Sequence, residues 1–221
     1  MADSKRDSVR NTLTVAIGVS FVCSILVAAT AILLKPVQEK NAEEFRQRII
    51  LEVAGLMQPG GDIATLFQAI DSRTVELGNG EMATVYLVRQ RDELQQVILP
   101  VHGPGLWSTM YGYLALAADG NTVRGLRFYS HAETPGLGDQ VDNPDWREQW
   151  VGKHVYDANG ESRIEVIRGK VQDEESPFEI DGLSGATLTG RGVTQLVRYW
   201  TGPQGFGPYL QRLQADGGDT T

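Results

Sequence analysis

The sequence predicts an α+β protein in which a single N-terminal transmembrane helix is followed by a mainly antiparallel sheet domain with flanking helices. Three observations lead to this fold class. A long uncharged apolar run, Asn11 to Leu34, lies near the N-terminus. Several strand-like runs follow in the middle of the chain, and an amphipathic helical pattern lies near the C-terminus.

Composition limits the classes of function. A chain of 221 residues, 41% of them hydrophobic, is long enough for one domain-sized core and an appendage. The net charge of −8 argues against a nucleic-acid-binding protein, which needs a basic face to neutralise phosphates. Cys23 is the only cysteine and the histidines lack metal-ligand spacing, so no disulfide or metal centre is expected from this chain. Redox chemistry, if this chain performs any, would therefore need a borrowed cofactor.

The apolar run is long enough to cross a bilayer once. As a helix, Leu13 to Leu34 would measure about 33 Å, close to the thickness of the hydrocarbon core. A cleaved signal peptide is the competing interpretation, because basic residues precede the run and Ala29-Thr30-Ala31 resembles a cleavage site. The run continues through Leu34, longer than a signal h-region, which favours an uncleaved anchor. Basic residues on both sides specify the orientation weakly, and we expect the N-terminus inside and the domain outside.

The spacing of apolar residues and the positions of Pro and Gly divide the rest of the chain into segments. Phe45, Ile49, Val53 and Leu56 recur at helical spacing in the charged segment after the anchor, which predicts a stalk helix ending before Pro59-Gly60-Gly61. The expected organisation is an N-terminal tail (1–12), a transmembrane helix (13–34), a stalk helix (35–58), a sheet domain (59–215) and a flexible tail (216–221). A short helix from Ile63 to Ile70, capped by Asp62, opens the sheet domain.

Runs rich in Val, Ile, Leu and Tyr predict the strands, and Asp119-Gly120-Asn121 is a hairpin signal. Later helices are expected from Asn143 to Gly152, and after a glycine-rich turn at Gly190 to Gly192, where Val193 and Trp200 belong to one apolar face. The expected strands are Ala83 to Val88, Gln96 to Val101, Thr109 to Ala117, Val123 to Ser130 and Arg163 to Arg168.

The segment from Asp181 to Thr189 places three hydroxyl groups and small residues just before the last amphipathic helix. Backbone N–H groups at a helix N-terminus bind anions, so a phosphate site is reasonable. Taken from the residues alone, a Ser/Thr/Gly stretch before a helix is more often a helix cap with a turn. A third possibility is a degenerate nucleophile elbow around Ser184 with His131 as its base, but the elbow pattern has glycine where Ala186 stands. A lone histidine such as His131 is expected to be solvated.

Ser184-Gly185-Ala186-Thr187, with Asp181 three residues before it, resembles the flavinylation motif of FMN-binding subunits in two ion pumps, the sodium-translocating NADH:quinone reductase and the Rnf complex. Glu133-Thr134-Pro135-Gly136-Leu137-Gly138, about fifty residues upstream, resembles the second signature of that family. Further stretches, including Val97 to Gly103, Gln149 to Lys153 and Gly205 to Pro208, resemble the NqrC family of the sodium pump more than its Rnf counterpart. The connection from Ile70 to Ala83 is shorter than this family leads us to expect.

The resemblance implies that Thr187 carries FMN through a phosphodiester, installed by a flavin transferase that uses FAD. It implies an electron-transfer subunit that works with other membrane subunits, in the bacterial inner membrane with a periplasmic domain, and completes no reaction alone. No glycine-rich dinucleotide fingerprint marks an NADH site. No catalytic residue is assigned, and the implied cofactor contacts are Leu183, Ser184, Gly185 and Ala186 with Asp181, then Glu133, Thr134, Gly136, Leu137 and Gly138, and Trp107 against the ring. A cofactor-free membrane-anchored scaffold is the alternative from another class.

Overall fold

The structure is a computed structural model that describes residues 9–58, 60–173 and 175–215. The chain divides between Phe45 and Arg46 into two compact units. The elements in chain order are the helix α1 (Val9–Val53), the helix α2 (Ile63–Phe67), the strands β1 (Ile70–Glu76), β2 (Met82–Gln90), β3 (Glu93–Pro104), β4 (Thr109–Ala117) and β5 (Val123–Ser130), the 3-10 helix η1 (Gly138–Asp142), the helix α3 (Pro144–Glu148), the short strands β6 (Glu165–Val166) and β7 (Glu179–Ile180), and the helices α4 (Thr187–Thr201) and α5 (Gly207–Ala215).

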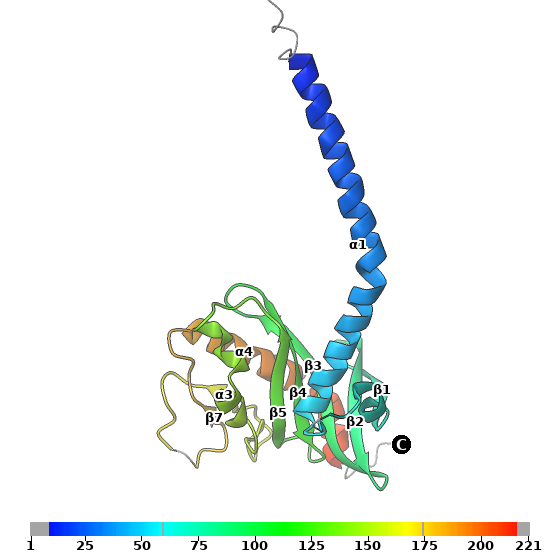
Figure 1. Cartoon of the computed structure of the whole chain (residues 1–221). Coiled ribbons are helices and arrows are strands. Elements are labelled where there is room, and N and C mark those ends of the chain that lie inside the picture. Colours follow the sequence, from blue (N-terminus) through cyan, green and yellow to red (C-terminus); the bar gives the residue numbers. More distant parts are fainter. Residues whose placement is uncertain (1–8, 59, 174, 216–221) are drawn as a thin grey trace, which may run out of the picture. The chain divides into compact units, whose positions relative to one another are not determined.

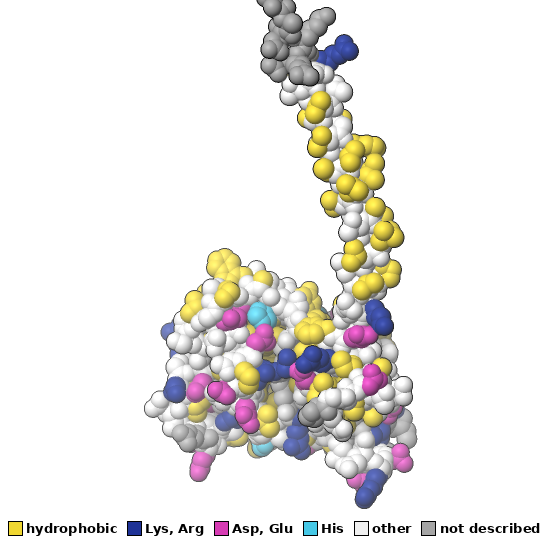
Figure 2. Space-filling view, viewed as in Figure 1, with side chains coloured by type: hydrophobic (Ala, Val, Ile, Leu, Met, Phe, Trp, Pro, Cys, Tyr) yellow, Lys and Arg dark blue, Asp and Glu magenta, His cyan; other side chains and the backbone are white. Residues whose placement is uncertain are grey.

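The first unit consists of the N-terminal part of α1. Figure 2 shows apolar side chains along it, and this is the one helix in the described chain that is long and apolar enough to cross a membrane. Thr14, Ser24 and Thr30 donate their hydroxyls to carbonyls four residues earlier, at 2.7–2.8 Å. These bonds satisfy polar groups that lipid would leave without a partner. The helix is therefore consistent with a single-pass membrane anchor. The outermost predicted tail residues, 1–8 and 216–221, lie outside the described residues.

The second unit is built on a five-stranded sheet in the order β1-β2-β3-β4-β5, in which every neighbouring pair is antiparallel (Figure 1). This confirms the predicted fold class. The connection from Ile70 to Ala83 is not a plain loop, because it contains β1. That strand lies at the sheet edge and buries only Ile70 and Val75 among polar neighbours, so its apolar pattern is too weak to recognise.

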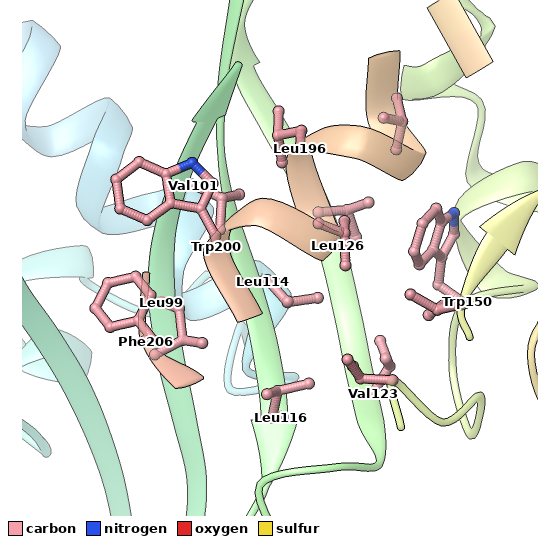
Figure 3. Close-up of a cluster of buried hydrophobic side chains, with 14 of the residues drawn as sticks. Leu99, Val101, Leu114, Leu116, Val123, Leu126, Trp150, Leu196, Trp200 and Phe206 are labelled. Atoms are coloured by element: carbon pink, nitrogen blue, oxygen red, sulfur yellow. The ribbon is translucent and has the colours of Figure 1, made fainter. Parts of the chain in front are cut away.

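Both faces of the sheet are covered. On one face, residues of β3 and β4 pack with α3, α4 and α5, and Figure 3 shows Trp200 and Leu196 of α4 against Leu99, Val101 and Leu114. The other face carries Ile98 and Tyr113, which pack with Ile49 and Val53 from the last turns of α1.

The helix α1 ends at Val53, earlier than the predicted end of the stalk helix, and Gly55 follows with φ +69°. The domain boundaries inferred from the sequence remain predictions.

The helix α4 begins at Thr187, so the predicted turn at Gly190 to Gly192 was wrong. These glycines lie inside the helix, and their role is close packing. A Cβ atom on Gly192 would lie 2.6 Å from the carbonyl oxygen of Pro104, and one on Gly190 would lie 3.0 Å from Val166. Their small size lets the first turns of α4 approach the end of β3 and the strand β6.

The predicted short helices and turns are present with shorter bounds. Asp62 accepts a hydrogen bond from the amide of Thr65 and caps α2, as predicted. Asn143 caps α3, which ends at Glu148 rather than continuing to Gly152. Of the strand predicted from Arg163 to Arg168, only Glu165–Val166 is extended and paired, in parallel with β7.

The β4–β5 turn depends on one carboxylate. Asp119 accepts hydrogen bonds from the amides of Asn121 (2.9 Å) and Thr122 (2.8 Å), and from the Thr122 hydroxyl. Burial raises the pKa of Asp119, but the bonds from Thr122 and Asn121 outweigh it, so the pKa lies below its ordinary value. The stabilisation is therefore complete above the unfolded pKa and is lost as the pH falls through the folded pKa.

We expect Asp119→Asn to lower the free energy of unfolding at pH 7 by about 0.5–1 kcal/mol, a figure reduced for solvent screening. The difference from the unsubstituted chain should shrink below about pH 4. Urea unfolding in detergent, followed by tryptophan fluorescence at several pH values, measures it. Asp92→Asn in the β2–β3 turn is the matched control, because no described residue donates to the Asp92 carboxylate. A difference that is constant with pH would contradict the assignment.

Candidate functional site

The hydroxyl of Thr187 is exposed at the first residue of α4. The preceding turn is closed by a hydrogen bond from the amide of Ala186 to the carbonyl of Leu183, at 3.0 Å, with Gly185 at φ +71°. The N-cap residue is Ala186, whose methyl side chain cannot accept a hydrogen bond. Because the hydroxyls of Ser184 and Thr187 bond to no described residue, they are not helix caps.

Two residues further along α4, Thr189 has the opposite environment. It is fully buried, and its hydroxyl donates a 2.6 Å hydrogen bond to Oε2 of Glu133. Sequence alone does not separate these two threonines, because both lie in the same short stretch. Of these two threonines, only Thr187 has an accessible hydroxyl that bonds to no described residue.

Glu133 connects the two sequence motifs. Its side chain is buried, and Oε1 accepts hydrogen bonds from the amides of Leu106 (2.9 Å) and Trp107 (3.2 Å) while Oε2 accepts from Thr189. Two glycines leave room for this carboxylate: a Cβ atom would lie 2.3 Å from Oε1 at Gly105 and 2.9 Å from Oε2 at Gly138. Glu133 therefore holds together the β3–β4 connection, the loop after β5 and the first turn of α4.

Residues Thr134 to Leu137 form a tight turn that places apolar groups at the surface. The amide of Leu137 donates to the carbonyl of Thr134 at 3.1 Å, and Gly136 has φ +75°, as a type II turn requires. The indole nitrogen of Trp107 donates to the Thr134 hydroxyl at 2.9 Å. We call the exposed side chains of Leu106, Trp107 and Leu137 the apolar platform; their exposed fractions are 42%, 70% and 41%.

The platform lies next to the turn that carries Thr187. A Cβ atom on Gly185 would lie 2.7 Å from the end of the Leu137 side chain, so the turn and the platform are close neighbours. The first turn of α4 adds another exposed apolar side chain, Leu188. An exposed hydroxyl and an exposed apolar surface thus occupy neighbouring parts of one site.

Three of the residues predicted to contact the cofactor also have structural roles. The side chains of Leu183 and Ala186 are buried in the core. Asp181 accepts a hydrogen bond from the amide of Val171 (2.7 Å) through its side chain and one from Trp146 (2.8 Å) through its carbonyl. These three residues shape the turn from inside, and any contact between them and a ligand remains a prediction.

The prediction that His131 is solvated was wrong. Its Nε2 lies 2.9 Å from Oδ2 of Asp142, and its Nδ1 accepts from the amide of Glu133 at 3.3 Å. The side chain is only 13% exposed, and η1 ends at its partner Asp142.

The structure does not support the hydrolase interpretation, because a nucleophile elbow needs a mostly parallel sheet. Ser184 follows a two-residue strand outside the five-stranded sheet, and that sheet is antiparallel.

A second feature beside Thr187 was missed in the sequence. A cavity of about 360 Å³ is lined by one side of α4, including Thr187 and Arg191, and by residues of and after β6, including Arg168. Arg191 follows Thr187 by one helical turn, and this spacing is the signal that the sequence offered. The complete lining is Glu165, Val166, Ile167, Arg168, Thr187, Arg191, Thr194, Gln195 and Arg198. We call this cavity the arginine groove.

Residues 105–202 match the model of the FMN-binding domain family, a range that contains both motifs, Trp107 and the arginine groove. The structure resembles the crystal structure of Shewanella oneidensis NqrC, with a TM-score of 0.73 and 28% identity over 79% of this chain and 99% of that one. The corresponding Na(+)-translocating NADH-quinone reductase chain from Parabacteroides distasonis shares the fold, with a TM-score of 0.68 and 24% identity over 80% and 96% of the two chains.

The similarity to relatives of known name covers nearly the whole chain. The NqrC protein of Vibrio parahaemolyticus, a component of its Na(+)-translocating NADH-quinone reductase, is 39% identical over 97% of this chain and 98% of its own length. The protein of the same name from Pseudomonas aeruginosa is 39% identical over 96% and 98%. The resemblance drawn from the two motifs is thereby confirmed. The chain belongs to the NqrC family, whose members are subunits of the Na(+)-translocating NADH-quinone reductase, an oxidoreductase complex.

Proposed function

We propose that this chain holds FMN covalently, through a phosphodiester to the Thr187 hydroxyl, and relays electrons between other redox centres of the sodium-translocating NADH-quinone reductase. The observation that carries the proposal is the contrast between two neighbouring hydroxyls. Thr187 is exposed and its hydroxyl is free of described partners, whereas Thr189 is buried against Glu133. A transferase acting on the folded chain would reach only the first.

The backbone around Thr187 suits a phosphate. At the start of a helix, the first N–H groups have no intrahelical acceptor and the helix dipole favours a negative charge. Ala186 provides no side chain that would occupy these donors. Gly185, in its positive-φ conformation, keeps the approach to Thr187 free of a side chain.

The apolar platform suits the flavin ring. Trp107 and Leu137 are exposed although their backbones are held in place by Glu133 and by the type II turn. Exposed apolar side chains on a rigid frame are typical of ligand surfaces. FMN supplies the redox chemistry, and attachment through phosphate leaves the ring itself unmodified, so the surrounding dipoles and apolar groups set its potential.

The single apolar helix anchors the chain, and we place it in the bacterial inner membrane with the flavin domain on the periplasmic side. The partners are the other membrane subunits of the pump and, during maturation, a flavin transferase that uses FAD. Labelling of engineered surface cysteines in intact cells tests the orientation.

The chemical test is peptide mass spectrometry on the full chain produced together with a flavin transferase. The peptide containing Thr187 should carry the added mass of FMN minus water, and the denatured band should fluoresce in a gel. An unmodified peptide and a colourless band would favour the cofactor-free scaffold. Attachment at Ser184 or Thr189 instead would contradict the assignment of the hydroxyl.

Contact between the ring and the platform predicts quenching of Trp107. In the chain lacking flavin, Trp107→Phe should remove a clear part of the tryptophan emission, because Trp107 is one of four tryptophans. In the flavinylated chain the same substitution should change the emission at least twofold less, since a stacked flavin already quenches Trp107. Fluorescence spectra of the four samples measure this. Equal losses with and without flavin would place the ring elsewhere.

A further inference from the structure

We propose that the arginine groove binds the phosphate of the flavin attached to Thr187, with Arg191 and Arg168 as its phosphate-binding side chains. The inference rests on the proposed function and extends it to two residues outside both motifs. It follows from the position of Thr187 in the groove, from the charges that line the groove and from the bonds those charges already make.

One side of α4 forms a wall of the groove. Thr187 and Arg191 are four residues apart, so they lie on the same helical face, one turn from each other. Arg168 comes from the opposite wall, just after β6, and lines the same cavity. Thr189, by contrast, points away from the groove into the contact with Glu133. A group attached to the Thr187 oxygen therefore starts in a cavity that Arg191 and Arg168 also line.

The charge of the groove favours an anion. Three arginines and one glutamate line it, a formal charge of +2 in a chain whose net charge is −8. Arg198 already has protein partners, because it pairs with Glu165 at 3.0 Å and donates a hydrogen bond to the carbonyl of Ile164. The side chains of Arg168 and Arg191 make no hydrogen bond or ion pair with any residue that the structure describes. The two positive charges that remain are thus available to a ligand.

The phosphodiester fits these charges better than the ring does. Guanidinium groups bind phosphate oxygens through paired, charge-assisted hydrogen bonds. The flavin ring is flat and largely apolar, and the apolar platform next to the Gly185 turn matches it. The phosphate in the groove and the ring on the platform would direct the cofactor across the start of α4.

The test compares the full wild-type chain produced with and without a flavin transferase. Both forms are treated in detergent with phenylglyoxal, which modifies accessible arginines, and the rate at each site is read by peptide mass spectrometry. Arg191 and Arg168 should react at least threefold more slowly in the flavinylated chain. Arg124, exposed on β5, is the internal control and should react equally in both forms.

Phosphorus NMR separates shielding by the phosphate from shielding by the ring. The phosphodiester resonance of the flavinylated chain should move in Arg191→Gln and stay in place in Arg124→Gln. Glutamine is a good helix former at this exposed position, so the fold is preserved. An unmoved resonance in Arg191→Gln would overturn the inference, because the ring would then account for the protection.

Other outcomes would also overturn it. Equal labelling rates, with the flavin confirmed on Thr187, would leave the proposed function intact and reject the phosphate site. Protection by added inorganic phosphate but not by flavinylation would assign the groove to a free anion. Protection seen only in the assembled complex would assign it to an acidic partner surface. An unmodified Thr187 would reject the proposed function together with the inference.

Discussion

Thr187→Ala is expected to abolish covalent flavin completely. The substitution removes the only hydroxyl at the start of α4 that is both exposed and lines the arginine groove. The Thr187 hydroxyl makes no hydrogen bond to a described residue, so its loss should not unfold the domain. In-gel fluorescence after denaturation and the mass of the peptide measure the effect, and the signal should fall to background.

Two matched controls separate attachment from folding. Ser184→Ala removes another exposed hydroxyl in the same turn and should keep the flavin. Thr189→Ser keeps the donor to Glu133 while removing a methyl group, and it should also keep the flavin. Loss of fluorescence in Ser184→Ala with retention in Thr187→Ala would show that the wrong oxygen was chosen.

Glu133→Ala is expected to have the largest effect on stability, about 2–4 kcal/mol of unfolding free energy. The change leaves the amides of Leu106 and Trp107 and the hydroxyl of Thr189 without their acceptor, at a residue that is only 5% exposed. It also leaves an empty space between Gly105 and Gly138, because both glycines were needed to fit the side chain. Urea unfolding followed by tryptophan fluorescence measures the loss.

Glu133→Gln tests whether acceptor geometry or charge matters more. Glutamine has the same shape and keeps one acceptor oxygen, which can serve the two amides while its NH₂ group faces the Thr189 oxygen. We therefore expect about half the loss seen with alanine. Glu148→Ala, at an exposed position of α3, is the control for removal of a carboxylate and should change stability by less than about 0.5 kcal/mol. A Glu133→Ala loss as small as that of Glu148→Ala would contradict the central role of this carboxylate.

The strands that were predicted well have strong local patterns. Thr109–Ala117 and Val123–Ser130 are found with the predicted bounds because each has apolar side chains and a clear turn between them. β1 was missed because an edge strand faces solvent along much of its length and shows little apolar alternation. The start of α4 was misplaced because glycines such as Gly190 and Gly192 are typical of a turn. In the structure these positions are glycine because α4 packs closely against Val166 and Pro104 there.

In the site, too, locally determined features were predictable from the sequence and long-range contacts were not. The turn residues Pro135 and Gly136 have a local signature, and the structure contains the type II geometry that it indicates. The hydrogen bond from Thr189 to Glu133 joins residues 56 positions apart, and the one from Trp107 to Thr134 joins residues 27 apart. No local pattern predicts such pairs, since they depend on how strands and helix pack.

The sequence by itself determined the fold class, the single apolar helix, the family and the short stretch in which we propose the flavin attachment. These properties depend on apolar periodicity and on motifs, and both are formed by residues close together in the sequence. Only the tertiary structure decided that Thr187 is accessible while Thr189 is enclosed, that Glu133 is an internal connector and that Arg168 meets Arg191 in one groove. Burial and charge pairing depend on residues distant in the chain, and packing alone determines which of them meet.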